Sequence, residues 1–464
     1  MKNQLCNRIQ PLLSRRAALQ SLSCGFGWLA LCDLLSRTSA SRALAAATGQ
    51  THFAPRAKRV IFLCMRGGPS HVDTLDYKPK LTEDNGREGR RRGSKLLGSP
   101  WKFQPSGQSG LWISDLLPQL QQQADKLCIL KSMQTEVPAH PQAFMAMHTG
   151  TSRFVRPSLG AWTLYGLGSE NENLPGFVTI TPPSAFGGSQ NYGSSFLPAD
   201  NQATRIGADN RPISAAIVAN LKPSSTVTKQ RRELDLLQKF NAAQLHRKES
   251  QARDTQVEGL IESFELGFRM QAELPEVLDI DQESAATKKL YGIGDGATDD
   301  FGRKCLLARR MVEAGVRFVE VTHGNWDQHA NLKNALEGNC TAIDRPAAGL
   351  LADLEARGLL KDTLVIWSGE FGRTPHAQGD DGRDHNNTAF SCWMAGGGVR
   401  GGTSYGESDE HGYEAVVNPI SMHDWHATIL YLLGLDHERL TYNYAGRDFR
   451  LTDVYGKVIQ DILS

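Results

Sequence analysis

Three apolar segments, each followed by acidic or histidine side chains, constrain the fold of this 464-residue chain most strongly. They occupy residues 59–65, 316–321 and 363–367. Continuous apolar runs of this length are typical of strands buried on both faces of a parallel sheet. Helix-forming segments at 301–314 and 342–357 alternate with the last two strands, which is the β-α-β pattern. The sequence therefore predicts an α/β fold.

Polar side chains follow directly where these strands end. The strand at 316–321 leads into Asp327 and His329, and the strand at 363–367 leads into Glu370 and then His385. In open α/β sheets, ligands bind just beyond the carboxyl ends of the strands. Because carboxylates and imidazoles are common ligands of divalent cations, the pattern predicts a metal site at this edge of the sheet.

The loop after the first strand allows two interpretations. His71 and Asp73 follow a pair of glycines that permits a tight turn, and Asp76 comes shortly after them. These side chains suit a divalent cation. They equally suit an ordinary loop with capping aspartates and a solvated histidine. Both interpretations stay open from this segment alone.

A further histidine is predicted at the beginning of a helix. Pro141 suits a first helical turn and Gly150 suits a helix end. His140 then lies at the helix N-terminus, where backbone N–H groups favour anions. His148 falls on the same helix face two turns later, and we interpret it as a packing or capping residue.

The N-terminus has the features of an export signal. Ser14-Arg-Arg-Ala-Ala-Leu19 precedes an uncharged apolar stretch, and small residues follow at 42–47. This order resembles a twin-arginine signal, the alternative being a surface helix with a chance arginine pair. We expect a signal at 1–45, a linker at 46–57 and one domain at 58–464. That predicts use of the twin-arginine export machinery and residence in the periplasm or at the cell surface of a bacterium.

Composition is that of an ordinary globular protein, with 40% hydrophobic and 22% charged residues. The net charge of +1 argues against nucleic acid or an anionic membrane as the main partner. No window after the first fifty residues is apolar enough to span a bilayer. The five cysteines beyond residue 45 are scattered, which indicates buried free thiols. A long polar stretch at 228–272 predicts a helical insertion.

Several motifs together resemble an exported bacterial family, domain of unknown function 1501. The segments that carry the resemblance are Arg66-Gly-Gly-Pro-Ser-His-Val-Asp-Thr-Leu-Asp76, Trp326-Asp-Gln-His329, Glu370-Phe-Gly-Arg-Thr-Pro375, Gly382-Arg-Asp-His385 and the helix ending in Leu433-Gly-Leu-Asp436. This family looks like a branch of the alkaline phosphatase and sulfatase superfamily. The resemblance spans about residues 58–463 and implies a three-layer α/β/α sandwich with a mostly parallel central sheet, alkaline phosphatase-like.

The resemblance also implies two divalent ions, which could be zinc, manganese or calcium. Asp327, His329 and His385 would hold one ion. Glu370 with Asp73 and His71 would hold the other.

The implied catalytic residues depart from the superfamily pattern. Phe371 stands where a metal-binding histidine normally follows the acidic residue. His140 stands at the nucleophile position, where it could be a metal ligand, a general base or a nucleophile. Arg373 or Arg66 would balance anionic charge.

Three hypotheses for function follow. The first is an exported metal-dependent hydrolase of phosphate or sulfate esters, acting on a small-molecule or glycan substrate. The second is a catalytically degenerate member that binds metal or an anionic glycan without turnover. The third, in which these loops are purely structural, conflicts with the gathering of ionisable residues at several strand ends.

Overall fold

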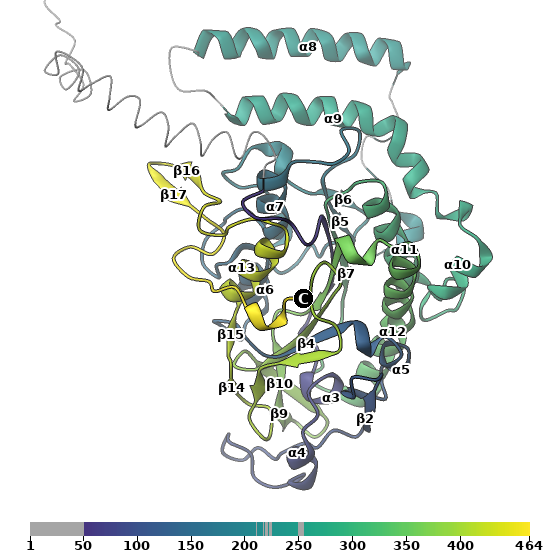
Figure 1. Ribbon diagram of the computed structural model, residues 1–464, viewed down its shortest axis with the longest axis vertical. Helices are drawn as coiled ribbons and strands as arrows, with labels where there is room; N and C mark the ends of the chain where they lie inside the picture. The colour runs from purple at the N-terminus through teal and green to yellow at the C-terminus, as the bar shows by residue number, and fades with distance from the viewer. Residues whose placement is uncertain (1–50, 210, 217, 219–220, 222–224, 249–254) are drawn as a thin grey trace, which may run out of the picture. The chain divides into compact units, whose positions relative to one another are not determined.

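The three strands predicted from apolar runs lie side by side at the centre of a nine-stranded sheet (Figure 1). The computed structural model describes residues 51–464, apart from 210, 217, 219, 220, 222–224 and 249–254. The export signal expected at 1–45 lies outside the described residues. Among the described helices, none combines the length and apolar character needed to cross a bilayer.

The sheet is mixed and mostly parallel, which confirms the predicted fold class. Its strand order is β12-β4-β11-β8-β1-β7-β5-β6, with β15 pairing beside β4. Only β11 runs antiparallel to its two neighbours, β4 and β8, among the pairings of this sheet. The strands are β1 Arg59–Met65, β4 Leu127–Gln134, β5 Phe177–Ile180, β6 Thr204–Ile206, β7 Phe318–His323, β8 Thr363–Ser368, β11 Phe390–Ala395, β12 Thr403–Tyr405 and β15 Ile420–Ser421.

Both faces of the sheet are covered, as a three-layer sandwich requires. In β1, Phe62 and Cys64 pack into one core, and Ile61 and Leu63 pack into the other. Helices α6 His140–Thr149, α7 Leu159–Leu167 and α13 Met422–Leu432 cover the first face. Helices α5 Pro118–Gln121, α11 Asp299–Glu313 and α12 Leu332–Ala356 cover the second (Figure 1).

Helix α12 begins ten residues before the start predicted from the sequence. Leu332, Leu336, Cys340 and Ile343 are all buried on one face of it. Their spacing is that of an amphipathic helix, so the apolar stripe continues ahead of residue 342 and helix formation follows it.

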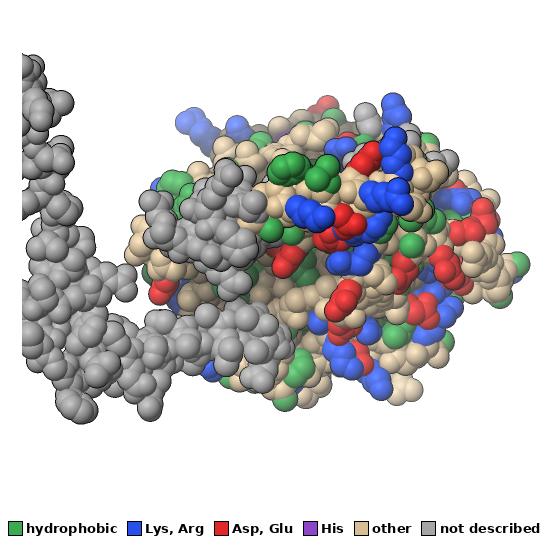
Figure 2. Space-filling view, turned by 90° about the horizontal axis from the view of Figure 1, so that it is seen from above, with side chains coloured by type: hydrophobic (Ala, Val, Ile, Leu, Met, Phe, Trp, Pro, Cys, Tyr) green, Lys and Arg blue, Asp and Glu red, His purple; other side chains and the backbone are tan. Residues whose placement is uncertain are grey.

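The stretch at 228–272 forms two long helices, α8 Val227–Lys248 and α9 Thr255–Leu278. Arg231 of α8 joins Glu265 of α9 through two nitrogen–oxygen contacts of 2.7 and 2.8 Å. Leu236 and Phe240 of α8 are exposed. On the face that carries α8, charged side chains of both signs are interspersed with apolar ones (Figure 2).

The smaller elements surround this framework. They are α3 His71–Thr74, α4 Pro79–Glu83, α10 Ala285–Leu290, and the hairpin strands β2 Phe103–Ser106, β3 Leu111–Ser114, β9 Gly372–Gln378, β10 Gly382–Asn386, β13 Glu407–Ser408, β14 Ala415–Val417, β16 Tyr442–Tyr444 and β17 Arg447–Phe449. Of these, the β9–β10 hairpin and the loops around α3 lead to the strand-end region.

A fully buried ion pair ties α3 to this hairpin. Arg383 on β10 contacts both carboxylate oxygens of Asp73, at 2.7 and 3.0 Å, and neither side chain is exposed. Arg383 also donates to the backbone carbonyls of Thr374 and Pro375. A buried charge is tolerated only when it is paired and hydrogen-bonded. Removing either Asp73 or Arg383 would therefore leave the other charge buried without a partner.

We predict that Asp73→Asn lowers the free energy of unfolding by about 3–5 kcal/mol, because it leaves the Arg383 guanidinium buried without its counter-charge. Asp281→Asn is the matched control, because its pair with Lys288 is exposed and such pairs contribute at most about 1 kcal/mol. Urea denaturation of both variants measures the difference. Unchanged stability of Asp73→Asn, together with loss of bound metal, would instead make Asp73 a metal ligand.

Candidate metal centre

Four side chains converge at the carboxyl ends of the central strands. Oδ1 of Asp327 lies 3.1 Å from Nε2 of His140, 2.9 Å from Nε2 of His329 and 3.3 Å from Nε2 of His385. One ligand atom from each of the four lies within 4.8 Å of all the others. The structure thus brings together the three residues predicted to share one ion and adds His140 to them.

Three separate pieces of the fold deliver these four side chains. Asp327 and His329 lie in the loop after β7, and His140 is the first residue of α6. His385 lies on β10, where it pairs in register with Arg373 on β9. Parallel strands end at one edge of the sheet, so the loops that follow them meet there.

Gly67 allows the loop after β1 to approach Asp327 closely. Its φ is +119°, and a Cβ placed on it would lie 2.7 Å from the backbone nitrogen of Asp327. A side chain at this position would therefore be strained and would also push the Asp327 loop away. The first glycine of the Gly-Gly turn noted in the sequence is thus required by the close packing of the Asp327 loop.

The second nitrogen of each imidazole is engaged by another oxygen. The three contacts join His385 Nδ1 to the Pro138 carbonyl at 2.7 Å, His140 Nδ1 to Glu370 Oε1 at 2.6 Å, and His329 Nδ1 to Gln378 Oε1. A carbonyl or carboxylate oxygen only accepts, so Nδ1 carries a proton, and Nε2 is the nitrogen left to face the Asp327 carboxylate. This is the arrangement that orients histidines in metal sites.

Two of these Nε2 atoms face each other. Nε2 of His329 lies 2.9 Å from Nε2 of His385, and Nε2 of His140 is buried without a regular hydrogen bond. Two unprotonated nitrogens repel at this distance unless a proton or a cation lies between them. Three imidazole nitrogens and one carboxylate oxygen fit the donor set of a divalent transition-metal ion.

Glu370 supports His140 from outside the cluster. Its side chain is fully buried and accepts the Gly67 N–H at 3.0 and 3.1 Å as well as contacting His140. A carboxylate behind a ligating histidine fixes the ring orientation and raises its basicity. Glu370 therefore orients His140 and is not itself one of the converging ligand atoms.

Arg373 is buried and links Asp327 to the neighbouring backbone by hydrogen bonds. Its Nε donates to the Gly68 carbonyl at 3.0 Å, and its Nη2 donates to Oδ1 of Asp327 at 2.5 Å. Nη1 donates to the Arg383 carbonyl at 3.2 Å. Because every guanidinium nitrogen already donates to a protein oxygen, Arg373 positions Asp327 and is not free to grip a substrate anion.

Arg66 is the arginine that remains partly open. Its nearest carboxylate oxygen, on Asp209, is 4.0 Å away, and its side chain is 19% exposed. The guanidinium lies over the Phe186 ring at 5.3 Å, and that ring stacks on His140 at 4.8 Å. Arg66 is thus separated from the cluster by one aromatic ring.

The charges of the cluster shift its pKa values strongly. Burial alone would raise the pKa of Asp327, but interactions with His140, His385 and Arg373 hold that pKa well below its usual range. Burial would lower the pKa of His140, but Asp327 and Glu370 raise it to about 9. Asp327 therefore stays ionised, as a cation ligand must.

The second ligand group expected from the sequence does not form among the described residues. Asp73 is paired with Arg383, and His71 is buried with its Nε2 2.9 Å from the Gly412 carbonyl oxygen. Neither joins Glu370 in a group of converging ligand atoms. The local crowding of acidic and histidine residues after β1 thus serves the packing of α3 against distant loops.

Several participants were missed at the sequence level. Gln378 and the Pro138 carbonyl orient two of the histidines, and Phe186 packs against the ring of His140. The position of Pro138, two residues before His140, was the one available hint. Gln378 lies between two of the quoted motifs but belongs to neither, and Phe186 lies outside all of them, so local sequence carried no signal for them.

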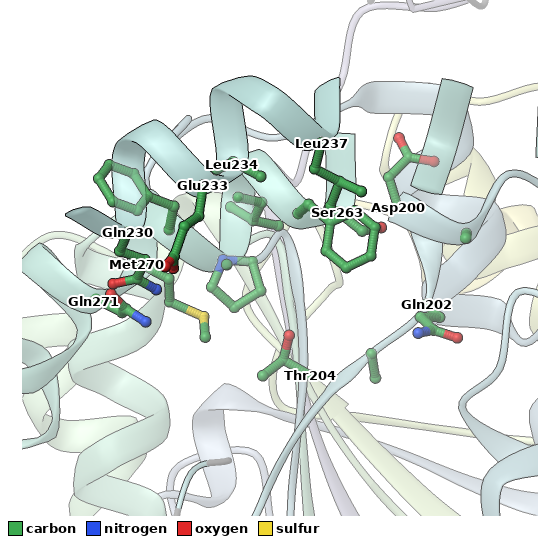
Figure 3. Close-up of a pocket in the computed structure, with 17 residues that line it drawn as sticks. Asp200, Gln202, Thr204, Gln230, Glu233, Leu234, Leu237, Ser263, Met270 and Gln271 are labelled. Atoms are coloured by element: carbon green, nitrogen blue, oxygen red, sulfur yellow. The ribbon is translucent and has the colours of Figure 1, made fainter. Parts of the chain in front are cut away.

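A separate cavity lies away from this centre. It has a volume of about 530 Å³ and is lined by α8, α9 and the segment around Asp200 and Thr204 (Figure 3). Burial and the neighbouring Glu262 raise the pKa of Asp200 to about 6. None of the lining residues belongs to the four-residue cluster.

Solved structures that align with this chain include three bacterial esterase-type enzymes. A PsFucS1 sulfatase from Pseudoalteromonas sp. is 13% identical with a TM-score of 0.36, covering 86% of this chain and 72% of that one. A phosphonate monoester hydrolase from Silicibacter pomeroyi is 10% identical with a TM-score of 0.38, covering 88% and 76%. Alkaline phosphatase from the Antarctic bacterium TAB5 is 9% identical with a TM-score of 0.32, covering 75% and 92%. Overlaps this loose lend no weight to a shared activity.

None of the curated proteins matches the sequence. The family comparison is decisive by contrast, because its match extends over nearly the whole described chain, residues 57–463. As the motifs at the strand ends indicated, the chain belongs to the family described as "Protein of unknown function (DUF1501)".

Proposed function

We propose that this protein is a metal-dependent hydrolase of phosphate or sulfate esters, with one divalent ion held by His140, Asp327, His329 and His385. The observation that carries the proposal is the convergence of three Nε2 atoms on a single carboxylate oxygen, with each Nδ1 engaged elsewhere. Imidazole-rich sites favour zinc over calcium and manganese, which prefer oxygen ligands. A bound ion would polarise the ester oxygen and lower the pKa of a bound water.

Residues around the cluster leave it open to solvent and provide a positive charge for an anionic substrate. Asp327 is 39% exposed and His329 is 36% exposed at their side chains, so solvent reaches the cluster from this side. Arg66 is the nearby cation that is not already saturated, and it suits the anionic part of an ester substrate. Phe186 and Phe371 pack against His140 and shield its ring from water.

A second candidate function, binding without turnover, has an observation in its favour. His140 contacts Glu370 through Nδ1 and faces Asp327 through Nε2, so neither nitrogen is free to attack a substrate. Hydrolysis therefore depends on an activated water. A protein that holds the ion and the anion but leaves no room for that water would bind the ester without cleaving it.

We also propose export through the twin-arginine route, on the basis of the residues at 14–47. Folding before export would allow the metal to be loaded in the cytoplasm.

Metal content tests the ligand set. We expect the purified protein to hold at least one equivalent of a transition metal at the cluster, and His385→Ala to weaken that binding at least about tenfold. His411→Ala is the matched control, since His411 also faces a carboxylate, Asp84, but lies outside the cluster. Elemental analysis after dialysis against graded chelator measures the loss. Equal retention by both variants would contradict the assignment.

Turnover separates the two candidate functions. We expect the metal-loaded protein to cleave a chromogenic phosphate or sulfate monoester, and chelation to abolish cleavage reversibly. Arg66→Ala is expected to raise KM at least about tenfold, because charged hydrogen bonds contribute about 1.5–3 kcal/mol. Arg87→Ala, at an exposed arginine paired with Asp84, serves as the control. Metal bound at the cluster without cleavage of any ester would favour the binding protein instead.

Export is tested by changing the arginine pair. Replacing Arg15 and Arg16 with lysine is expected to leave the protein in the cytoplasm of a bacterial host, because the twin-arginine machinery reads this pair. Cell fractionation and immunoblotting measure the distribution. Undiminished export of this variant would rule out the twin-arginine route.

A further inference from the structure

A second group of potential ligands lies deeper in the protein. It consists of Cys64 on β1, His148 on α6 and Glu320 on β7. One ligand atom from each lies within 4.8 Å of the other two, and the three residues are 0%, 3% and 2% exposed. None of them takes part in the cluster around Asp327.

The sheet register explains why these side chains meet. In the parallel pairing of β1 with β7, Cys64 lies beside Thr322 and Phe62 lies beside Glu320. Residues two apart on a strand point to the same face, so Cys64 and Glu320 share the face that α6 covers. The ring of His148 lies 5.9 Å from that of Phe62, which places the imidazole over this part of the sheet.

The contact between Nε2 of His148 and the Glu320 carboxylate requires a positive charge, either a proton or a metal ion. Its Nδ1 lies 2.8 Å from the Phe144 carbonyl oxygen, which only accepts, so Nδ1 carries a proton. Its Nε2 lies 3.2 Å from Oε2 of Glu320 and has no regular hydrogen bond, although it is buried. A neutral imidazole would therefore point a lone pair at a carboxylate. Either a proton or a metal ion must separate them.

We propose that Cys64, His148 and Glu320 form a buried site for one divalent transition-metal ion, for which zinc is the best fit. A thiolate, an imidazole and a carboxylate are all zinc ligands. Together they carry two negative charges, which a divalent ion neutralises, and a buried site requires such neutrality. Zinc bond lengths of 2.0–2.3 Å put tetrahedral ligand atoms about 3.3–3.6 Å apart, so a modest contraction of the observed group accommodates the ion.

A further oxygen is available beside this group. The Thr322 hydroxyl is buried without a hydrogen-bond partner, and Thr322 lies in register with Cys64 on the same strand pair. The rival arrangement is a buried ion pair between protonated His148 and Glu320, with Cys64 as a spectator thiol. Both arrangements are neutral overall, so only metal binding distinguishes them.

Such an ion would have a structural rather than a catalytic role. It would join α6 to β1 and β7 below the strand-end cluster. His140 and His148 are eight residues apart on α6, which corresponds to about 12 Å along the helix. Binding at His148 would therefore fix the helix that presents His140.

Cobalt spectroscopy tests the proposal, because the cluster around Asp327 contains no sulfur. Metal-free full-length protein is titrated with Co²⁺ under reducing conditions, and sulfur-to-cobalt charge transfer is recorded in the near ultraviolet. We expect the band in the wild-type protein and in Asp327→Ala. We expect its loss in Cys64→Ser, whereas Cys392→Ser, which changes another buried cysteine of the same core, keeps it.

The absence of a sulfur–cobalt band in the wild type would overturn the proposal, as would an equal band in Cys64→Ser. Circular dichroism checks that each variant is folded. If Cys64→Ser does not fold, Glu320→Gln and His148→Gln replace it, since each keeps the thiol and removes one other ligand. The band is then expected to require at least about tenfold more cobalt. An unchanged cobalt requirement in both variants would show that Glu320 and His148 are not ligands of this ion and would overturn the proposal.

Discussion

The carboxylate of Asp327 is the contact on which the strand-end region depends. Its Oδ1 atom faces three imidazole nitrogens and receives a hydrogen bond from the buried Arg373. Charges gathered this closely are stable only when each is compensated and held in place. Gly67 permits the necessary approach of two loops, and the β9–β10 hairpin brings His385 and Arg373 to the same carboxylate. These surrounding elements thus position the Oδ1 atom of Asp327 among the three imidazoles.

The sequence predicted the parts of this arrangement that are local. The strands around 59–65 and 363–367 were recognisable because both faces are buried, and Asp327 and His329 because they directly follow a strand. The role of Asp73 was not recognisable in this way. Its partner Arg383 is 310 residues away, and nothing in the local pattern distinguishes a carboxylate that binds metal from one that pairs with arginine. The same reason hid the contact between His140 and Glu370.

Helix α6 connects the two groups of potential metal ligands found among the described residues. His140 at its first residue faces Asp327, and His148 near its end faces Glu320. In both, Nδ1 is held by an oxygen and Nε2 points at a carboxylate. Sequence spacing showed that the two histidines share a helix face, but the burial of Cys64 and Glu320 beneath that face follows from the pairing of β1 with β7. A helix fixed at both ends in this way would hold His140 with little freedom.

The most direct test of the central claim is anomalous X-ray diffraction from crystals of the zinc-loaded protein, recorded on both sides of the zinc absorption edge. An anomalous peak about 2.0–2.2 Å from the Nε2 atoms of His140, His329 and His385 and from a carboxylate oxygen of Asp327 is the predicted result. Zinc at full occupancy elsewhere, with these four side chains unliganded, would contradict it. The same map reports independently on Cys64, His148 and Glu320.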